Sequence, residues 1–235
     1  MKTETITILI ADDHPLTRTG IRAILEATPD LSVVGEAEDG DTAQRLVGEL
    51  RPQVLLLDLK MPGLSSAELE KWVRVRYPEI VTIVLTAHDR DAYLSEMIEA
   101  GVAGYLDKNS RGEQLITAIR QAVGGQVLFS SEQIQRARLW RQQIGAQWQS
   151  LTQREREVLK CLANGLDNAR IASSLSISQK TVAFHITNLM GKIHVASRQE
   201  ASAWFNKNIP NDLVPEPVKE GGPGKPKIDR DAPGT

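Results

Sequence analysis

Short apolar runs alternate with segments of helical periodicity through the first half of the chain. The apolar runs lie at residues 6–11, 31–37, 54–58, 80–87 and 103–107. They are short and almost continuous, which is the pattern of strands buried on both faces. Between them, apolar residues recur three and four positions apart at about 15–27, 40–50, 64–77, 91–100 and 111–123. This alternation predicts an α/β fold with a doubly wound, five-stranded parallel sheet.

A purely helical pattern takes over from Thr152. Thr152 and Glu155 have the spacing of a capping box that starts a helix, and Gly165 is placed to end it. A second helix is expected over about 168–175 and a third over about 179–193. Two short helices joined by a tight turn predict an all-α helix-turn-helix domain.

Two segments follow neither pattern. Gly124-Gly125 interrupts the first half, and the Gln- and Arg-rich residues after it predict a linker, partly helical. The end of the chain is rich in Pro, Gly and charge, which predicts a disordered tail. The predicted divisions are a first domain at 1–125, a linker at 126–147, a second domain at 148–209 and a tail at 210–235.

Composition narrows the class of protein. With 235 residues and 41% hydrophobic content, the chain can build two cored domains. No window approaches eighteen consecutive apolar residues, and the N-terminus lacks a signal-peptide layout, so we expect a cytoplasmic protein with no membrane association. The single cysteine, Cys161, lies among apolar residues and is expected in the core, without an intrachain disulfide.

Charged and hydroxyl residues follow four of the predicted strands. Ligands of doubly wound sheets bind beyond the carboxyl ends of the strands, so these residues should converge at one edge. A helix cap at Asp12 and a turn at Asp58 would explain either residue singly, but not the convergence of the whole group. The residues are the three carboxylates Asp12, Asp13 and Asp58, the hydroxyl of Thr86 and the ammonium of Lys108.

This acidic rim predicts phosphoryl chemistry. Crowded carboxylates repel one another, and oxygen ligands with room for water suit Mg²⁺. Asp58 could then act as a nucleophile toward phosphorus and form an aspartyl phosphate. Lys108 could pair with the phosphoryl oxygens, and the Thr86 hydroxyl could donate to them.

The segments that carry these residues resemble the receiver domain of bacterial two-component response regulators over about residues 5–123. They are "ILIADDHPLTRTGI", "VLLLDLKMPG", "IVLTAHD" and "AGVAGYLDKN". The resemblance implies a flavodoxin-like sheet, with Asp58 as phosphoacceptor for a histidine kinase and Asp12 and Asp13 as the acidic metal site. It also implies that Lys60 supplies a backbone carbonyl to the metal, that Thr86 and Tyr105 form the switch pair, and that Lys108 is the family's invariant lysine. The alternative for Tyr105 is a core aromatic at the end of an apolar strand.

The second half differs from the first in charge and in the face of its third helix. Residues 1–125 hold 13 Lys/Arg against 20 Asp/Glu, whereas residues 151–208 hold 8 against 4. A basic domain is a candidate for nucleic-acid binding. Val182, Ile186, Leu189 and Ile193 form an inner stripe, so the opposite face is available to a DNA major groove.

The outer face divides into two kinds of expected DNA contact. Phosphate contacts are expected from Ser178, Lys180, Thr181 and Lys192. Base-edge contacts are expected from Ala183, Phe184, Thr187 and Asn188, although Phe184 could instead pack on the turn or the linker.

The segments "LTQREREVL", "LANGLDNARIASSLSISQKTVAFHI" and "NLMGKI" resemble the LuxR-type helix-turn-helix of the NarL/FixJ group of regulators, over about residues 150–208. Ala183 and Thr187 stand where members often carry a basic or long polar residue, so the family's base preferences do not transfer to this chain.

Together the two halves predict a phosphorylation-switched transcription regulator that binds promoter DNA, as a homodimer when phosphorylated. Ala201, Trp204 and Phe205 in the last helix are a candidate dimer surface. One alternative is a constitutive dimeric regulator that does not need phosphorylation. Another is an aspartyl-phosphate phosphohydrolase, which generally needs an acid two residues after the nucleophile. That position is Lys60, which disfavours an enzyme.

Overall fold

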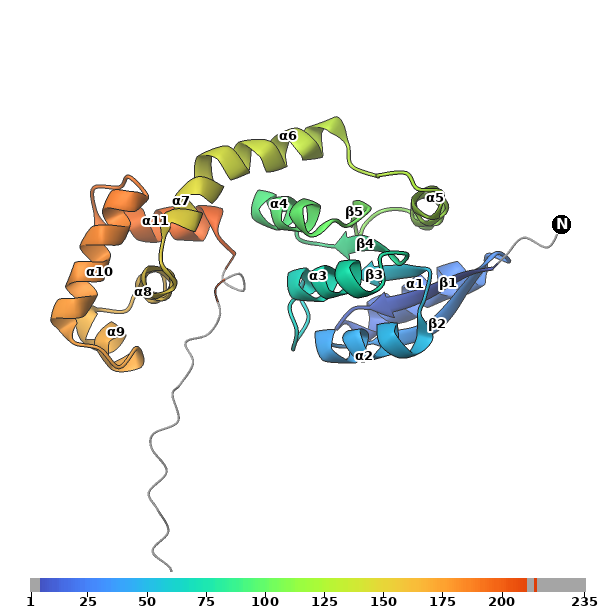
Figure 1. Cartoon of the computed structure of the whole chain (residues 1–235), viewed down its shortest axis with the longest axis horizontal. Helices are drawn as coiled ribbons and strands as arrows, with labels where there is room; N and C mark the ends of the chain where they lie inside the picture. The colour runs from blue at the N-terminus through green and yellow to red at the C-terminus, as the bar shows by residue number, and fades with distance from the viewer. Residues whose placement is uncertain (1–4, 211–213, 215–235) are drawn as a thin grey trace, which may run out of the picture. The chain divides into compact units, whose positions relative to one another are not determined.

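The computed structural model describes residues 5–210 and Val214. Its contacts divide the chain into two compact units, the first ending at Trp148 and the second beginning at Gln149. Residues 126–147, expected to be a linker, fall within the first unit. Each unit is described by itself below, with the element labels of Figure 1.

A parallel sheet forms the centre of the first unit, as predicted. Its strands pair in the order β2-β1-β3-β4-β5. Chain order reverses on the two sides of β1, so the carboxyl ends of β1 and β3 lie at the switch point of the sheet. The strands are β1 (Ile6–Ala11), β2 (Leu31–Ala37), β3 (Val54–Leu57), β4 (Val81–Thr86) and β5 (Gly104–Asp107).

Two hydrophobic cores cover the two faces of this sheet. On one face, β1 places Ile8 and Ile10 against helices α1 (Pro15–Glu26) and α5 (Gly112–Val123). On the other, Leu9 and Ala11 pack with α2 (Gly40–Leu50) and α3 (Ser66–Arg76), and α4 (Asp91–Ala100) lies beside α3. Every residue of β3 is buried, because both faces of the strand are covered.

The predicted linker is largely helical and packs on the receiver-like unit. Helix α6 (Ser131–Trp140) begins at a Ser130–Gln133 capping box and lies along α4. It continues through a π-helical turn, η1 (Arg141–Gly145), into α7 (Ala146–Ser150). Figure 1 shows α6 running above α4, away from α5, and continuing into α7.

The second unit is entirely helical in the residues that the structure describes. Its helices are α8 (Gln153–Ala163), α9 (Asn168–Ser174), α10 (Gln179–Lys192) and α11 (Arg198–Asn208). The predicted capping box at Thr152 and Glu155 is confirmed, and Gly165 follows α8 with a left-handed φ of 79°. The predicted inner stripe of α10 is also confirmed, because all four of its residues are buried.

Helix α11 corrects one prediction. Ala201 and Phe205 have no exposed surface and pack where α11 crosses α8, so they belong to the core of the second unit. They cannot form the dimer surface that the apolar pattern suggested, and of its three residues only Trp204 is partly exposed. The pattern was ambiguous because an apolar stripe has the same spacing whether it faces a core or a partner.

Within the described residues, no helix is both long and apolar enough to cross a membrane. Most of the predicted tail at 210–235 lies outside the described residues. Val214 is described and is buried, and its carbonyl oxygen accepts a hydrogen bond of 2.8 Å from Lys160 Nζ.

Two glycines of α2 should respond in opposite directions to alanine. Gly40 N donates to Pro62 O at 2.9 Å, and a Cβ on Gly40 would lie 2.0 Å from Leu64 O. We expect Gly40→Ala to lower the free energy of unfolding by about 1–3 kcal/mol, because backbone must move to accommodate the methyl group.

Gly48→Ala is the matched control for this close approach. The nearest atom to a Cβ on Gly48 would be Tyr77 Oη at 3.5 Å, which is an ordinary contact. Replacing this helical glycine should therefore raise the free energy of unfolding by about 0.5–1 kcal/mol. Urea titrations followed by circular dichroism measure both variants. Equal effects of the two substitutions would contradict the proposed steric cause.

Candidate functional site

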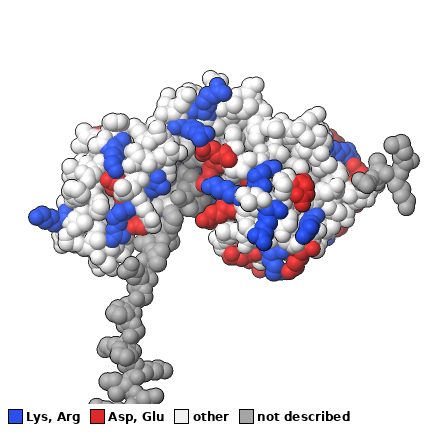
Figure 2. Space-filling model, in the orientation of Figure 1, with Lys and Arg blue, Asp and Glu red and all other residues white. Residues whose placement is uncertain are grey.

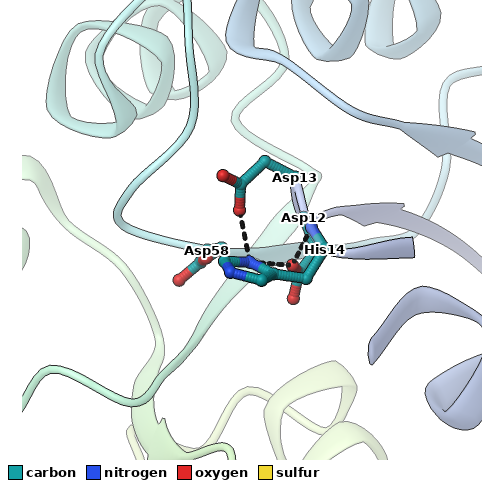
Figure 3. Close-up of side chains that lie close together, drawn as sticks. All are labelled: Asp12, Asp13, His14 and Asp58. Atoms are coloured by element: carbon teal, nitrogen blue, oxygen red, sulfur yellow. Dashed lines mark hydrogen bonds and ion pairs between the residues drawn. The ribbon is translucent and has the colours of Figure 1, made fainter. Parts of the chain in front are cut away.

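Three neighbouring strands deliver the acidic rim. Asp12 and Asp13 follow β1, Asp58 follows β3, and Thr86 ends β4. Because the strands are parallel and adjacent, their carboxyl ends meet at one edge of the sheet. Figure 3 shows Asp12, Asp13 and Asp58 gathered there, with the His14 ring among them. The structure therefore brings together the carboxylates that the sequence predicted to converge.

Lys108 comes to this edge from β5 and bridges two carboxylates. Its Nζ lies 2.8 Å from Asp12 Oδ2 and 2.7 Å from Asp58 Oδ2. Burial would lower the pKa of Lys108, but hydrogen bonds to the two carboxylates outweigh it and raise that pKa. The backbone N–H of Lys108 also donates to Thr86 O at 3.0 Å, which fixes the residue beside β4.

Asp58 is almost fully buried, with 3% of its surface exposed. Its Oδ1 accepts a hydrogen bond of 2.7 Å from Leu59 N, and Lys108 contacts its other oxygen. Burial raises the pKa of Asp58, and Lys108 opposes that rise without cancelling it. A buried carboxylate whose negative charge is only partly compensated is suited to bind a cation or to react covalently.

The loop after Asp58 is held by a residue that the motifs did not single out. Ser66 Oγ donates to Asp58 O at 2.7 Å and to Leu59 O at 3.0 Å, and Ser66 is buried. Lys60 lies in the same loop with an exposed side chain, its Nζ 5.9 Å from the centre of the Tyr93 ring. The sequence pattern predicted only a helical segment over about 64–77, so the anchoring role of Ser66 needed the tertiary structure.

The acidic rim has the composition of a divalent-metal site. Ligand atoms of Asp12, Asp13, His14 and Asp58 all lie within 4.8 Å of one another. Asp13 Oδ1 is buried and accepts no hydrogen bond, although His14 Nδ1 lies 2.6 Å away in an ion-pair contact. An orphaned carboxylate oxygen beside two further carboxylates fits a hard cation. His14 is the member of this group that the sequence analysis missed.

The predicted switch residues are joined through His88. The His88 backbone N–H donates to Thr86 Oγ1 at 3.1 Å, and the His88 carbonyl accepts from Tyr105 Oη–H at 2.6 Å. Tyr105 and Thr86 are both buried. Burial and the nearby Asp89 carboxylate raise the pKa of Tyr105, so its hydroxyl remains a donor. His88, unnoticed in the sequence, is the connection between the two side chains.

Helix α10 presents most of the predicted DNA-contact residues to solvent. Ser178 caps its N-terminus by accepting from Thr181 N at 3.0 Å, so both residues lie at the first turn. Lys180, Ala183 and Thr187 are exposed, Phe184 is 63% exposed, and Asn188 is half-buried. On the face of the second unit in Figure 2, basic side chains are more numerous than acidic ones.

Lys192 has a structural partner inside the second unit. Its Nζ lies 2.7 Å from Glu155 Oε2, and the Glu155 side chain is nearly buried. Burial alone would raise the pKa of Glu155, but Lys192 and Thr152 lower it overall. Lys192 therefore compensates a buried carboxylate, and a phosphate contact would have to share its ammonium group.

Family comparisons match both units. Residues 8–120 match the response regulator receiver domain, and residues 149–205 match the bacterial regulatory proteins of the luxR family. The first matched range lies within the acidic-rim unit and the second within the helix-turn-helix unit.

Some relatives match this chain over most of both lengths. The chain is 41% identical to the nitrate/nitrite response regulator NarP of Escherichia coli, over 84% of this chain and 93% of NarP. It is 37% identical to the transcriptional regulatory protein LiaR of Bacillus subtilis, over 86% of this chain and 98% of LiaR. Among solved structures, a complex of the response regulator RcsB with DNA matches with a TM-score of 0.56 and 28% identity, over 87% of this chain and 99% of RcsB.

Asp58→Asn should stabilise the protein at neutral pH. The raised pKa of Asp58 means that the fold disfavours its ionised form, so removing the charge should raise the free energy of unfolding at pH 7 by on the order of 1 kcal/mol. The gain should disappear below about pH 4, where this carboxyl is protonated in both folded and unfolded states.

Urea titrations between pH 4 and pH 7 measure this effect. Asp107→Asn is the matched control, because Asp107 is exposed and its Oδ1 accepts from Asn109 N, an interaction that asparagine retains. A loss of stability at pH 7 in Asp58→Asn would show that the buried charge is fully compensated in the folded protein.

Proposed function

The chain belongs to the NarL/FixJ family of two-component response regulators, which are phosphorylation-switched, DNA-binding transcriptional regulators, and from this we propose specific residues for each step. Asp58 is the proposed phosphoacceptor, with a histidine kinase as phosphodonor. The observation that carries the proposal is the buried Asp58 carboxylate, held by Lys108 at the end of β3 and surrounded by further carboxylates.

The transfer reaction uses groups already in contact. An Asp58 carboxylate oxygen would attack the phosphorus of a phosphohistidine, so that a P–O bond forms as the P–N bond breaks. The Lys108 ammonium, 2.7 Å from Asp58 Oδ2, can move onto the new phosphoryl oxygens while it keeps its contact with Asp12. Lys60 occupies the position where a phosphohydrolase would carry its general acid, which supports a stored aspartyl phosphate over rapid turnover.

Mg²⁺ is the proposed cofactor of this step. Asp12, Asp13, Asp58 and the backbone carbonyl of Lys60 would hold it, and the cation would lie against Asp13 Oδ1, which accepts no hydrogen bond among the described residues. When bound, Mg²⁺ supplies charge neutralisation for the carboxylates and the phosphoryl oxygens. The residues themselves position the nucleophile and exclude most solvent from it.

Thr86 and Tyr105 are the proposed switch pair. A phosphoryl oxygen on Asp58 would accept from the Thr86 hydroxyl and draw it away from His88 N. The His88 segment would then shift, and the Tyr105 hydroxyl would lose its partner, the His88 carbonyl. Charge-assisted hydrogen bonds contribute about 1.5–3 kcal/mol each, so two or three supply the roughly 5.5 kcal/mol needed to move a 1:99 equilibrium to 99:1.

DNA recognition is assigned to α10. Its outer face would enter the major groove, with Ala183, Phe184, Thr187 and Asn188 at base edges. Ser178, Lys180 and Thr181 would contact phosphates from the first turn, and Lys192 would do so while bound to Glu155. We propose a homodimer on promoter DNA when Asp58 is phosphorylated, and a cytoplasmic location follows from that target. A constitutive dimer that ignores phosphorylation is the remaining alternative.

A small-molecule phosphodonor with Mg²⁺ should increase promoter affinity by roughly 5- to 150-fold, the usual range of coupling between two sites. The measurement is a fluorescence-anisotropy titration of a promoter fragment enriched in vitro from random DNA. Asp58→Asn should keep the unstimulated affinity and show no increase. A variant that responds like the wild type would exclude Asp58 as the phosphoacceptor, and an unresponsive wild type would favour the constitutive alternative.

Lys180→Ala and Lys192→Ala should separate DNA contact from folding. Lys180 is exposed, so its loss should weaken binding to all sequences and reduce the salt slope by about one, without changing stability. Lys192→Ala should also lower the free energy of unfolding by about 1 kcal/mol, because Glu155 loses its ammonium partner. Unchanged stability in Lys192→Ala, or an unchanged salt slope in Lys180→Ala, would contradict these roles.

A further inference from the structure

One arginine of the linker helix α6 joins it to the loop between β4 and α4. Arg136 Nη1 and Nη2 each lie 2.9 Å from an oxygen of Asp89, in a two-point fork. The same guanidinium contacts Asp91 at the start of α4, with Nε and Nη2 lying 2.8 and 2.7 Å from Oδ1. Two carboxylates on one planar guanidinium fix its orientation, and together they raise its pKa.

Other contacts seat α6 on the same face. Gln133 Nε2 donates to Tyr105 O at 3.1 Å, and the side chains of Arg141 and Glu99 form an ion pair. Ala137, one position after Arg136, is buried. Before the helix begins, Leu128 N donates to Ala103 O at 2.7 Å, at an isolated bridge to β5. The segment is therefore attached along both α4 and β5, and Figure 1 shows α6 running above α4.

The loop that Arg136 holds is also the loop that carries the switch. His88 is bonded to both Thr86 and Tyr105, and Asp89, the next residue, is bonded to Arg136. A shift of His88 on phosphorylation of Asp58 would therefore carry the Asp89 carboxylate with it. The two-point contact between the Arg136 guanidinium and the Asp89 carboxylate would then break, because such contacts tolerate little movement of either partner.

We propose that Arg136 is a positioning residue that latches α6 onto the β4–α4 loop and holds the switch in its unphosphorylated arrangement. This inference rests on the proposed role of Asp58 as phosphoacceptor. Phosphorylation weakens the contact between Arg136 and the loop. Because coupling between two equilibria is reciprocal, the intact contact disfavours phosphorylation by the same factor. Because α6 continues through η1 and α7 into the second unit, its release changes how the DNA-binding unit is tethered.

Linkage makes the latch measurable without DNA. Beryllium fluoride with Mg²⁺ mimics a phosphoryl group on an aspartate, and its affinity for the full-length protein can be measured by isothermal titration calorimetry. Arg136→Ala should bind it about three- to tenfold more tightly than the wild type, since the ion pairs are partly exposed and the coupling is modest. Arg136→Lys keeps the positive charge but loses the two-point contact, so its affinity for beryllium fluoride should lie between those of the wild type and Arg136→Ala.

Arg138→Ala is the matched control on the same helix. Arg138 is exposed, and no ion pair links it to another of the described residues, so its loss should leave the affinity unchanged. Asp89→Asn should reproduce the effect of Arg136→Ala. The variant with both substitutions should bind beryllium fluoride little more tightly than either single variant. Hydrogen exchange should show that beryllium fluoride reduces the protection of residues 131–140 in the wild type.

The outcomes distinguish the latch from the function on which it rests. If the wild type binds beryllium fluoride but Arg136→Ala binds it equally, the latch is refuted and the phosphoacceptor stands. If the wild type does not bind it, or Asp58→Asn binds it as well, the phosphoacceptor assignment fails. Should Arg136→Ala fail to fold, Arg136→Lys and Asp89→Asn decide the question, and additive effects in the double variant would refute a direct pair.

Discussion

The bridge from Lys108 to Asp12 and Asp58 is the interaction on which the first unit depends. Three charged side chains meet where β1, β3 and β5 end, and two of them are almost fully removed from water. Burial of a carboxylate is unfavourable unless a partner compensates it, and one ammonium group between two carboxylates compensates each only in part. The remaining electrostatic imbalance is the physical basis for the cation and the phosphoryl group proposed at this edge of the sheet.

His88 connects this charged edge to the surface of the unit. Its N–H and carbonyl bond to Thr86 and Tyr105, and the next residue, Asp89, binds the linker helix. These contacts form a continuous path of hydrogen bonds and ion pairs from β4 to α6. A small movement at Thr86 therefore has a defined route to the segment that precedes the DNA-binding unit, without any disruption of the two hydrophobic cores.

The second unit divides its charged residues between folding and recognition. Lys192 compensates Glu155, and Arg198 binds Asn168 Oδ1 at 2.6 Å, so these cations hold helices together. Lys180 and the small residues of α10 face solvent instead. Exposed cations such as Lys180 are those that the proposed phosphate contacts would use, and such contacts would make the affinity for DNA sensitive to salt.

Local spacing was enough to predict the strands, the capped helix start at Thr152, and the convergence of Asp12, Asp58, Thr86 and Lys108. Each depends on periodicity, on capping within four residues, or on the rule that parallel strands end at one edge. Local spacing could not predict that Ala201 and Phe205 are core, that Lys192 meets Glu155, or that Arg136 reaches Asp89. Those pairs are joined by packing between elements far apart in the chain, and a side chain's charge or apolarity does not say which distant partner packing brings to it.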